Sequence, residues 1–306
     1  MSTTTLPGPD LGQRITELAA RSPEGRRRRL WRGRTGSVIR HTLMIVACVV
    51  MIYPLLWLLG SSFKPTEAIF RNLAILPGEW DWSNYNTGWN SLTFQFGRYM
   101  LNSLAIVGGS LLGNLVSCSM AAYAFARLQF RGRRIWFAIM LLTIMLPIHV
   151  VIVPQYIMFR ELDLVNTFWP LIIPKLLATD AFFIFLMVQF FRGIPRELEE
   201  AARLDGCGHA RIFLRVMLPL AVPALATTAI FTFIWTWNDF FSQLIFLTSE
   251  EVKTAPVALR MFLDSSAGSN WGPMFAMSIV TIVPIFLVFL FGQKYLVRGI
   301  ATTGIK

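Results

Sequence analysis

The stretch Pro195–Pro219, PRELEEAARLDGCGHARIFLRVMLP, decides how the chain is interpreted, because it is polar and amphipathic between long apolar segments. Proline is favoured in the first turn of a helix, and the acidic residues that follow suit the positive end of the helix dipole. We therefore predict a helix of about three turns over Pro195–Asp205, ended by Gly206. A second short helix is predicted over His209–Met217, before the chain returns to an apolar run.

One face of the first predicted helix carries residues at three- or four-residue spacing, with small side chains at its centre. The members of this face are Ile194, Leu198, Ala201, Ala202 and Asp205. Small residues allow the backbone of a partner to approach closely, which favours a docking surface. The alternative is an amphipathic link that only lies on a membrane surface.

The rest of the chain is much more apolar than a soluble domain. Of its 306 residues 55% are hydrophobic and 15% are charged, and the mean hydropathy is +0.55. A helix that crosses a bilayer needs about 20 mostly apolar residues. Runs of this kind lie at about 39–60, 100–125, 135–158, 166–190, 219–246 and 272–296. We predict an all-α membrane protein with six transmembrane helices.

Arginine and lysine are concentrated in the segments that six crossings would place on one side. Examples are the Arg26–Arg29 run, Arg131 to Arg134 in the second-to-third link, and Arg211 in the fourth-to-fifth link. Such residues are retained in the cytoplasm, so both termini are predicted to be cytoplasmic. The net charge of +11 then orients the chain and contacts membrane lipid, rather than binding nucleic acid. We expect a cytoplasmic arginine-rich tail over residues 1–38 and one membrane domain over 39–306.

Cysteine and histidine usage predicts neither a disulfide nor a metal site. No two cysteines share an oxidising compartment in the expected topology, and the histidines lack ligand spacing. These residues are Cys48, Cys118, Cys207, His41, His149 and His209.

The pattern Glu200-Ala201-Ala202, Gly206, Val216 and Leu218-Pro219 resembles the EAA loop of the permease subunits of ABC importers. The resemblance implies that the Pro195–Asp205 helix is a coupling helix that sits in a cleft of a cytoplasmic ABC ATPase. In that case Glu200 pairs with a basic group of the ATPase, Ala201 and Ala202 pack into the cleft, and Gly206 permits the turn. The predicted coupling residues are Leu198, Glu200, Ala201, Ala202, Asp205 and Gly206.

Other motifs resemble the carbohydrate-uptake branch, specifically the maltose-type second permease subunit. They are Phe63-Lys64-Pro65, Asn102-Ser103, the Ala121–Arg127 segment AAYAFAR, Trp237–Phe240, and the tail from Gly299 to Lys306. This resemblance implies a type I ABC importer permease fold, with a core over about 97–296 and a coupling-helix loop over 191–218.

The function implied is that of a permease subunit of an ATP-driven, binding-protein-dependent sugar importer in the bacterial cell membrane. The chain would form half of the pore, with a second permease subunit, an ABC ATPase dimer and an extracytoplasmic sugar-binding protein as partners. It lacks a phosphate-binding G-x-x-x-x-G-K-[ST] loop, so it is not expected to be an enzyme, and ATP and magnesium are expected on the ATPase. The alternatives are an ABC importer of a non-sugar solute and a self-sufficient secondary transporter.

Asn238 and Asp239 lie in the fifth expected span, where an acidic residue is costly and suggests a functional site. They could bond sugar hydroxyls while Trp235 or Trp237 stacks on a sugar ring. Alternatively, Asp239 pairs structurally with another helix or a partner subunit.

Overall fold

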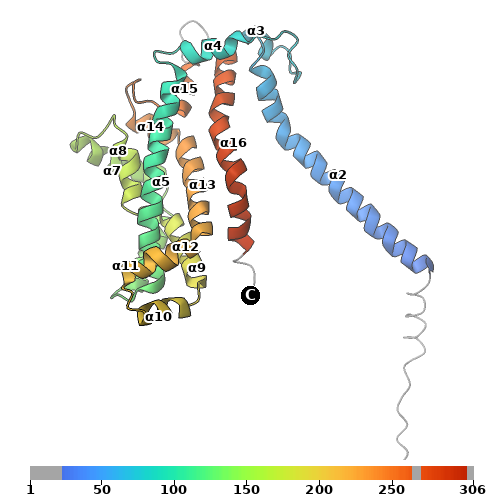
Figure 1. Ribbon diagram of the computed structural model, residues 1–306. Coiled ribbons are helices and arrows are strands. Elements are labelled where there is room, and N and C mark those ends of the chain that lie inside the picture. The colour runs from blue at the N-terminus through green and yellow to red at the C-terminus, as the bar shows by residue number, and fades with distance from the viewer. Residues whose placement is uncertain (1–22, 264–269, 302–306) are drawn as a thin grey trace, which may run out of the picture. The chain divides into compact units, whose positions relative to one another are not determined.

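The computed structural model describes residues 23–263 and 270–301, with side chains described over 37–263 and 270–295. The chain divides into two compact units, residues 1–58 and 59–306. Within the described ranges every regular element is helical (Figure 1).

The first unit is dominated by α2 (Pro23–Ser61), which begins before the span expected from residue 39. Its Ser37–Ser61 part is long and apolar enough to cross a membrane. A helix with apolar residues on all sides is suited to lipid. The Arg26–Arg29 run lies on this helix, and its side chains fall outside the described part of the chain.

The second unit contains helices of very different lengths. In chain order they are α3 (Thr66–Ile69), α4 (Ser83–Asn90), α5 (Phe96–Arg127), α6 (Arg133–Thr143), α7 (Ile148–Glu161), α8 (Trp169–Leu176), α9 (Ala181–Gly193), α10 (Glu197–Leu204), α11 (His209–Ile212), a π-helical turn (Phe213–Met217), α12 (Leu218–Leu220), α13 (Val222–Asn238), α14 (Phe241–Phe246), α15 (Ala255–Met261) and α16 (Trp271–Ala301).

The described residues contain four helical segments long and apolar enough to span a membrane, or six if two bent helix pairs each count as one span. One bent pair is α6 with α7, at 101°, and the other joins His209–Leu220 to α13, at 76°. These are the third and fifth expected spans, which are therefore broken rather than straight. Pro147 precedes α7, and Pro223 lies in the first turn of α13. Proline has no backbone N–H to donate within a helix but is accommodated at its start, so a new helix begins next to each of these prolines.

The helix α5 lies at the centre of the second unit, where it packs against α8, α9 and α13, and α13 packs in turn against α16. Small residues on α5 permit a close approach of α8. A Cβ added to Gly113 would lie 2.9 Å from the backbone nitrogen of Leu176. The small residues of the second expected span thus bring α5 and α8 together.

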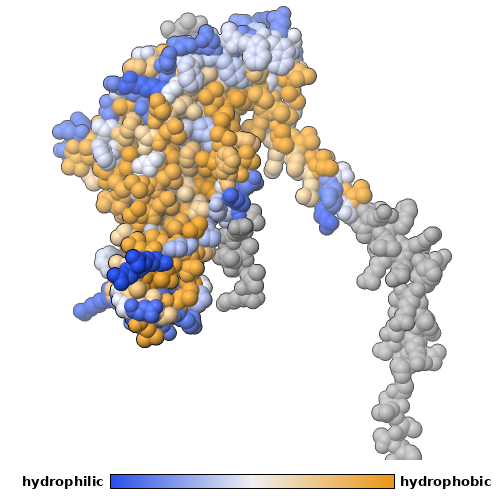
Figure 2. All heavy atoms as spheres, viewed as in Figure 1, coloured by the Kyte–Doolittle hydropathy of each residue, from blue (hydrophilic) through white to orange (hydrophobic). Residues whose placement is uncertain are grey.

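The two ends of the second unit differ in composition from its middle. In Figure 1 α10 and α11 lie at one end of α5, whereas α4 and α15 lie at the other. Figure 2 shows mostly apolar residues between these ends and polar residues at both. This banding is what a membrane-embedded unit requires.

Two polar side chains organise the end that contains α4. Lys64 is buried, and its Nζ donates to the carbonyl oxygens of Asn72 and Ala74 at 2.9 and 2.6 Å. The buried Asn84 donates to the carbonyl oxygens of Ser62 and Lys64 at 3.1 and 2.8 Å. Burial lowers the pKa of Lys64. The Phe63-Lys64-Pro65 step therefore fixes the link that follows the first span.

A second set of hydrogen bonds, which we call the Asn166 fastening, joins the α7–α8 link to the segment after α14. Asn166 has a φ of 67°. Its Oδ1 accepts hydrogen bonds from the backbone nitrogens of Thr248 and Ser249 at 3.1 and 2.8 Å. The Asn166 side chain thereby joins two segments whose bonded residues are 82 and 83 positions apart in the sequence.

Candidate functional site

The predicted docking helix is present as α10, Glu197–Leu204, which is shorter by two residues at its start than the Pro195–Asp205 helix expected from the sequence. Pro195 precedes the helix instead of lying in its first turn. Three glutamates occupy the first turn and Arg203 the last, as the helix dipole favours. The second predicted helix is present as α11 and the π-helical turn that follows it.

Gly206 ends α10 in a left-handed conformation, with a φ of 77°. The backbone nitrogen of Gly206 donates to the Arg203 carbonyl, and that of Cys207 donates to the Ala202 carbonyl, both at 2.9 Å. This pair of bonds is a Schellman motif, for which glycine is the favoured residue. A side chain at this position would meet no neighbour within 4 Å, so the requirement for glycine comes from the backbone alone.

The inner side of α10 is anchored by a buried ion pair. Nε of Arg127, at the end of α5, lies 3.3 Å from Oε1 of Glu199, and their side chains are only 4% and 7% exposed. Arg127 also donates hydrogen bonds to the carbonyl oxygens of Phe191 and Ile194 at the end of α9. The arginine therefore ties the start of the loop to two membrane helices.

Neither member of this ion pair was predicted from the sequence. In the sequence Arg127 stands out only as the end of a family motif, and Glu199 only as one of the acidic residues at the start of its helix. Two features of the sequence could have indicated the ion pair. One is the arginine that ends the AAYAFAR segment, and the other is Glu199, which precedes Glu200 and is not required by the EAA pattern.

The outer side of α10 is unusually apolar for a polar link. Leu204 is 90% exposed, and Leu198 and Ala201 are exposed on the same helix. Glu200 and Asp205 are exposed as well, whereas Ala202 is half-buried and packs against the core of α5 and α9. The predicted face is thus divided: Ile194 and Ala202 contact the chain's own core, and Leu198, Ala201 and Asp205 remain free. We call the exposed side of α10, formed by Leu198, Glu200, Ala201, Leu204 and Asp205, the outer face of α10.

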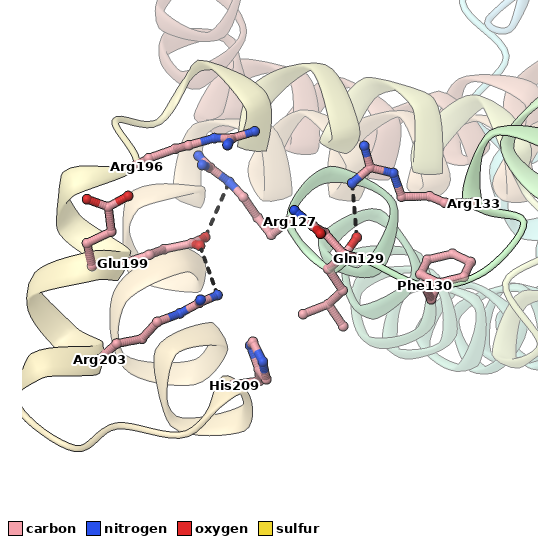
Figure 3. Close-up of a pocket in the computed structure, with 10 residues that line it drawn as sticks. Arg127, Gln129, Phe130, Arg133, Arg196, Glu199, Arg203 and His209 are labelled. Atoms are coloured by element: carbon pink, nitrogen blue, oxygen red, sulfur yellow. Dashed lines mark hydrogen bonds and ion pairs between the residues drawn. The ribbon is translucent and has the colours of Figure 1, made fainter.

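A cavity of about 670 Å³ lies beside α10 and the start of α6 (Figure 3). Its lining includes four arginines, Arg127, Arg133, Arg196 and Arg203, but only two glutamates, Glu199 and Glu200. Arg203 lies 4.0 Å from Glu199, and Arg133 donates to the Leu128 carbonyl at 3.0 Å. The excess of positive charge makes this part of the surface attractive to acidic groups.

The four residues predicted to line the solute path occupy different environments. Trp235 and Asn238 are exposed, although Asn238 donates to the Ile234 carbonyl of its own helix at 2.8 Å. Asp239 accepts from the backbone nitrogen of Ser242 at 3.0 Å, which stabilises the start of α14.

Trp237 is fully buried, in contrast to the surface position that the prediction requires. Its Nε1 donates to the Thr281 carbonyl at 3.2 Å, and its ring stacks on Phe233 with centroids 5.5 Å apart. It joins α13 to α16 and offers no ring face to a solute in this structure.

The family model for the binding-protein-dependent transport system inner membrane component matches residues 113–302. The chain belongs to this family. The permease is 35% identical over 280 residues to the probable ABC transporter permease protein YurM of Bacillus subtilis, with 92% of this chain and 91% of the relative covered. It is 34% identical over 266 residues to the diacetylchitobiose uptake system permease protein NgcG of Streptomyces coelicolor, with 87% of each covered.

A solved structure agrees with this assignment. The permease matches a chain from the crystal structure of a bacterial ABC transporter involved in the import of the acidic polysaccharide alginate, with a TM-score of 0.76 and 25% identity, covering 86% of the permease and 97% of that chain. The predicted all-α permease fold and multi-pass membrane location are confirmed. The family comprises transport components rather than enzymes.

Proposed function

We propose that this permease forms, with a second permease subunit, the pore of an ATP-driven sugar importer. The outer face of α10 docks on a cytoplasmic ABC ATPase dimer, which binds the ATP and magnesium, and both termini of the permease are cytoplasmic. A binding protein on the other side of the membrane delivers the sugar. Support for a sugar comes from the diacetylchitobiose and alginate named for a relative and a structural neighbour.

The observation that carries the docking proposal is the exposure of Leu204 on a helix that is otherwise firmly held. An exposed leucine contributes little to the stability of its own chain, but an aliphatic side chain on a rigid helix suits a partner's groove. The Arg127–Glu199 pair and the turn at Gly206 hold α10 from both ends. A force applied to the outer face would therefore be transmitted to α5 and α9.

The proposal is tested by purifying the tagged permease with its neighbours in mild detergent. We expect Leu204→Asp to weaken association with the ATPase by about 30-fold or more, as for a central interface residue. The matched control is Leu73→Asp, because Leu73 is also exposed but precedes α4 at the opposite end of the unit. Docking through α10 would be contradicted if both variants lost the ATPase equally, or if neither variant lost it.

Two further variants separate docking from force transmission. Glu200→Ala should reduce association with the ATPase, because it removes an exposed acid from the outer face. Gly206→Pro should leave the outer face chemically unchanged but disrupt the turn, since proline cannot adopt the positive φ observed there. We expect that variant to uncouple ATP hydrolysis from uptake.

A further inference from the structure

Two oppositely charged side chains lie inside a membrane span, away from α10. Lys175 and Asp180 both belong to the span Trp169–Gly193, and the Lys175 Nζ lies 2.8 Å from the Asp180 Oδ2 and 3.0 Å from its Oδ1. Their side chains are 29% and 23% exposed, so the pair lies at a surface of the subunit. Charged groups within spans are costly and usually face the bundle interior or a water-filled cavity.

The pair bridges the break between α8 and α9. Ala178, within this break, has a φ of 55°. The backbone nitrogen and the hydroxyl of Thr179 both donate to the Pro174 carbonyl, at 3.3 and 2.8 Å. Irregular backbone at membrane depth occurs where it is buried in protein or lines a water-filled cavity, and here Thr179 is exposed. This arrangement favours contact with water on the importer's path over contact with lipid.

Asp180 is held in a fixed orientation by Asn114, which is fully buried on α5. The Asn114 amide donates to Asp180 Oδ2 at 2.7 Å and to the Thr232 hydroxyl of α13 at 3.1 Å. The Ser117 hydroxyl donates to the Lys175 carbonyl at 2.7 Å. Three spans thus converge on the ion pair, and its carboxylate cannot move freely towards a membrane surface.

Two exposed aromatic side chains lie on the helices that carry Asp180 and its hydrogen-bond network. Trp235 follows Thr232 by about one turn of α13, and its side chain is 49% exposed. Its ring centroid lies 5.2 Å from that of Phe182, which is also exposed and follows Asp180 by two residues. A half-buried charged pair together with an exposed aromatic ring matches the two kinds of surface on a sugar, the hydroxyl groups and the apolar ring face.

We propose that Lys175, Asp180 and Trp235 form a contact site for the hydroxylated ring of the solute on the import path. Asp180 accepts hydrogen bonds from hydroxyl groups, Lys175 donates to them, and Trp235 packs against the ring face. This inference rests on the proposed function and adds to it the residues that meet the solute in this subunit. It keeps Trp235 from the sequence prediction and replaces the buried Trp237 with Lys175 on α8 and Asp180 directly before α9, which the sequence did not indicate.

The first experiment asks whether the site faces water, and it does not depend on the solute. In the assembled importer in lipid vesicles, Cys48, Cys118 and Cys207 are replaced and single cysteines are placed at Thr179 or Trp235. Membrane-impermeant methanethiosulfonate ethylsulfonate reacts with thiolate, so a water-facing cysteine should react at least about tenfold faster than Leu142→Cys, an exposed position on α6. If both react as slowly as that control, lipid or the second permease covers the surface and the site is refuted.

The second experiment measures uptake of labelled diacetylchitobiose and alginate oligosaccharides by the same vesicles. Lys175→Met and Asp180→Asn should each raise the half-saturating sugar concentration by about tenfold or more, because each removes a charged hydrogen-bonding group. The exchanged pair Lys175→Asp with Asp180→Lys keeps an ion pair, so full recovery of wild-type uptake would show a purely structural role and overturn the site. Fast thiol modification with no uptake of either sugar by the unmodified importer would place the site on the path while refuting the proposed sugars.

Discussion

Replacing Arg127 by methionine should release the inner side of α10 from the membrane helices. The change leaves Glu199 as a charge with 7% side-chain exposure and no arginine at 3.3 Å, and it removes the donors to two carbonyl oxygens at the end of α9. Breaking a buried pair by removing one partner costs about 3–5 kcal/mol. Even the lower figure corresponds to an increase of about 100-fold in the population with α10 detached.

Hydrogen exchange of the backbone amides in α10 measures this population in the purified importer. If the α10 amides of the unmodified importer are protected by about 100-fold or more, they should exchange at least about 100-fold faster in Arg127→Met. If they are protected less than this, their protection should be lost completely. The matched control is Arg203→Met, because Arg203 is 4.0 Å from the same glutamate but its side chain is 50% exposed. Solvent at the half-exposed Arg203 screens this second pair, so it contributes only about 0–1 kcal/mol.

A double replacement separates the charge effect from general damage. Arg127→Met combined with Glu199→Leu removes both buried charges, and such replacements are often neutral in stability. The double variant should therefore recover much of the protection that the single variant loses. Exchange in Arg127→Met no faster than in Arg203→Met would refute the anchoring role of the pair.

Three other changes test separate parts of the structure. Gly206→Ala should destabilise the end of α10 by about 1–2 kcal/mol, because an L-residue is forced into the left-handed region, and the exchange rate of the Cys207 amide reports it; an unchanged rate would argue against the observed turn. Asn166→Gly keeps the backbone freedom that a φ of 67° requires but removes the bonds to Thr248, so we expect a lower Tm in calorimetry, and an unaltered Tm would contradict the fastening. Trp237→Leu should lower the Tm without changing solute preference, because replacing a buried aromatic side chain by a smaller one lowers the free energy of unfolding by about 3 kcal/mol. A changed solute preference would instead place Trp237 on the solute path.

The fold could be predicted from the sequence largely because lipid imposes simple rules. Three features each predict one structure. Apolar runs of sufficient length predict spanning helices, the small residues of α5 predict close helix packing, and Gly206 predicts the end of a helix. The breaks in the third and fifth spans were harder to predict, since Pro147 and Pro223 resemble the prolines that other membrane helices accommodate. Whether a helix bends at such a proline depends on neighbours that hydropathy does not describe.

The site was predicted in part, for a different reason. A local pattern identifies α10, but the buried partner of Glu199 is Arg127 on α5, so only the tertiary structure shows which glutamate is buried. The same applies to Trp235 and Trp237, which are two residues apart and face opposite environments. The ion pair of Lys175 and Asp180 joins residues five positions apart across a helix break, and that break is invisible in the apolar run around it.

The central claim is that the outer face of α10 meets an ABC ATPase, and photo-crosslinking from position 204 tests it most directly. Benzoylphenylalanine placed at Leu204 in intact membranes should give an adduct whose mass spectrum identifies an ATPase with a phosphate-binding loop, whereas the same group at Leu73 should not. Adducts only with lipid, or with the same proteins from both positions, would contradict the account.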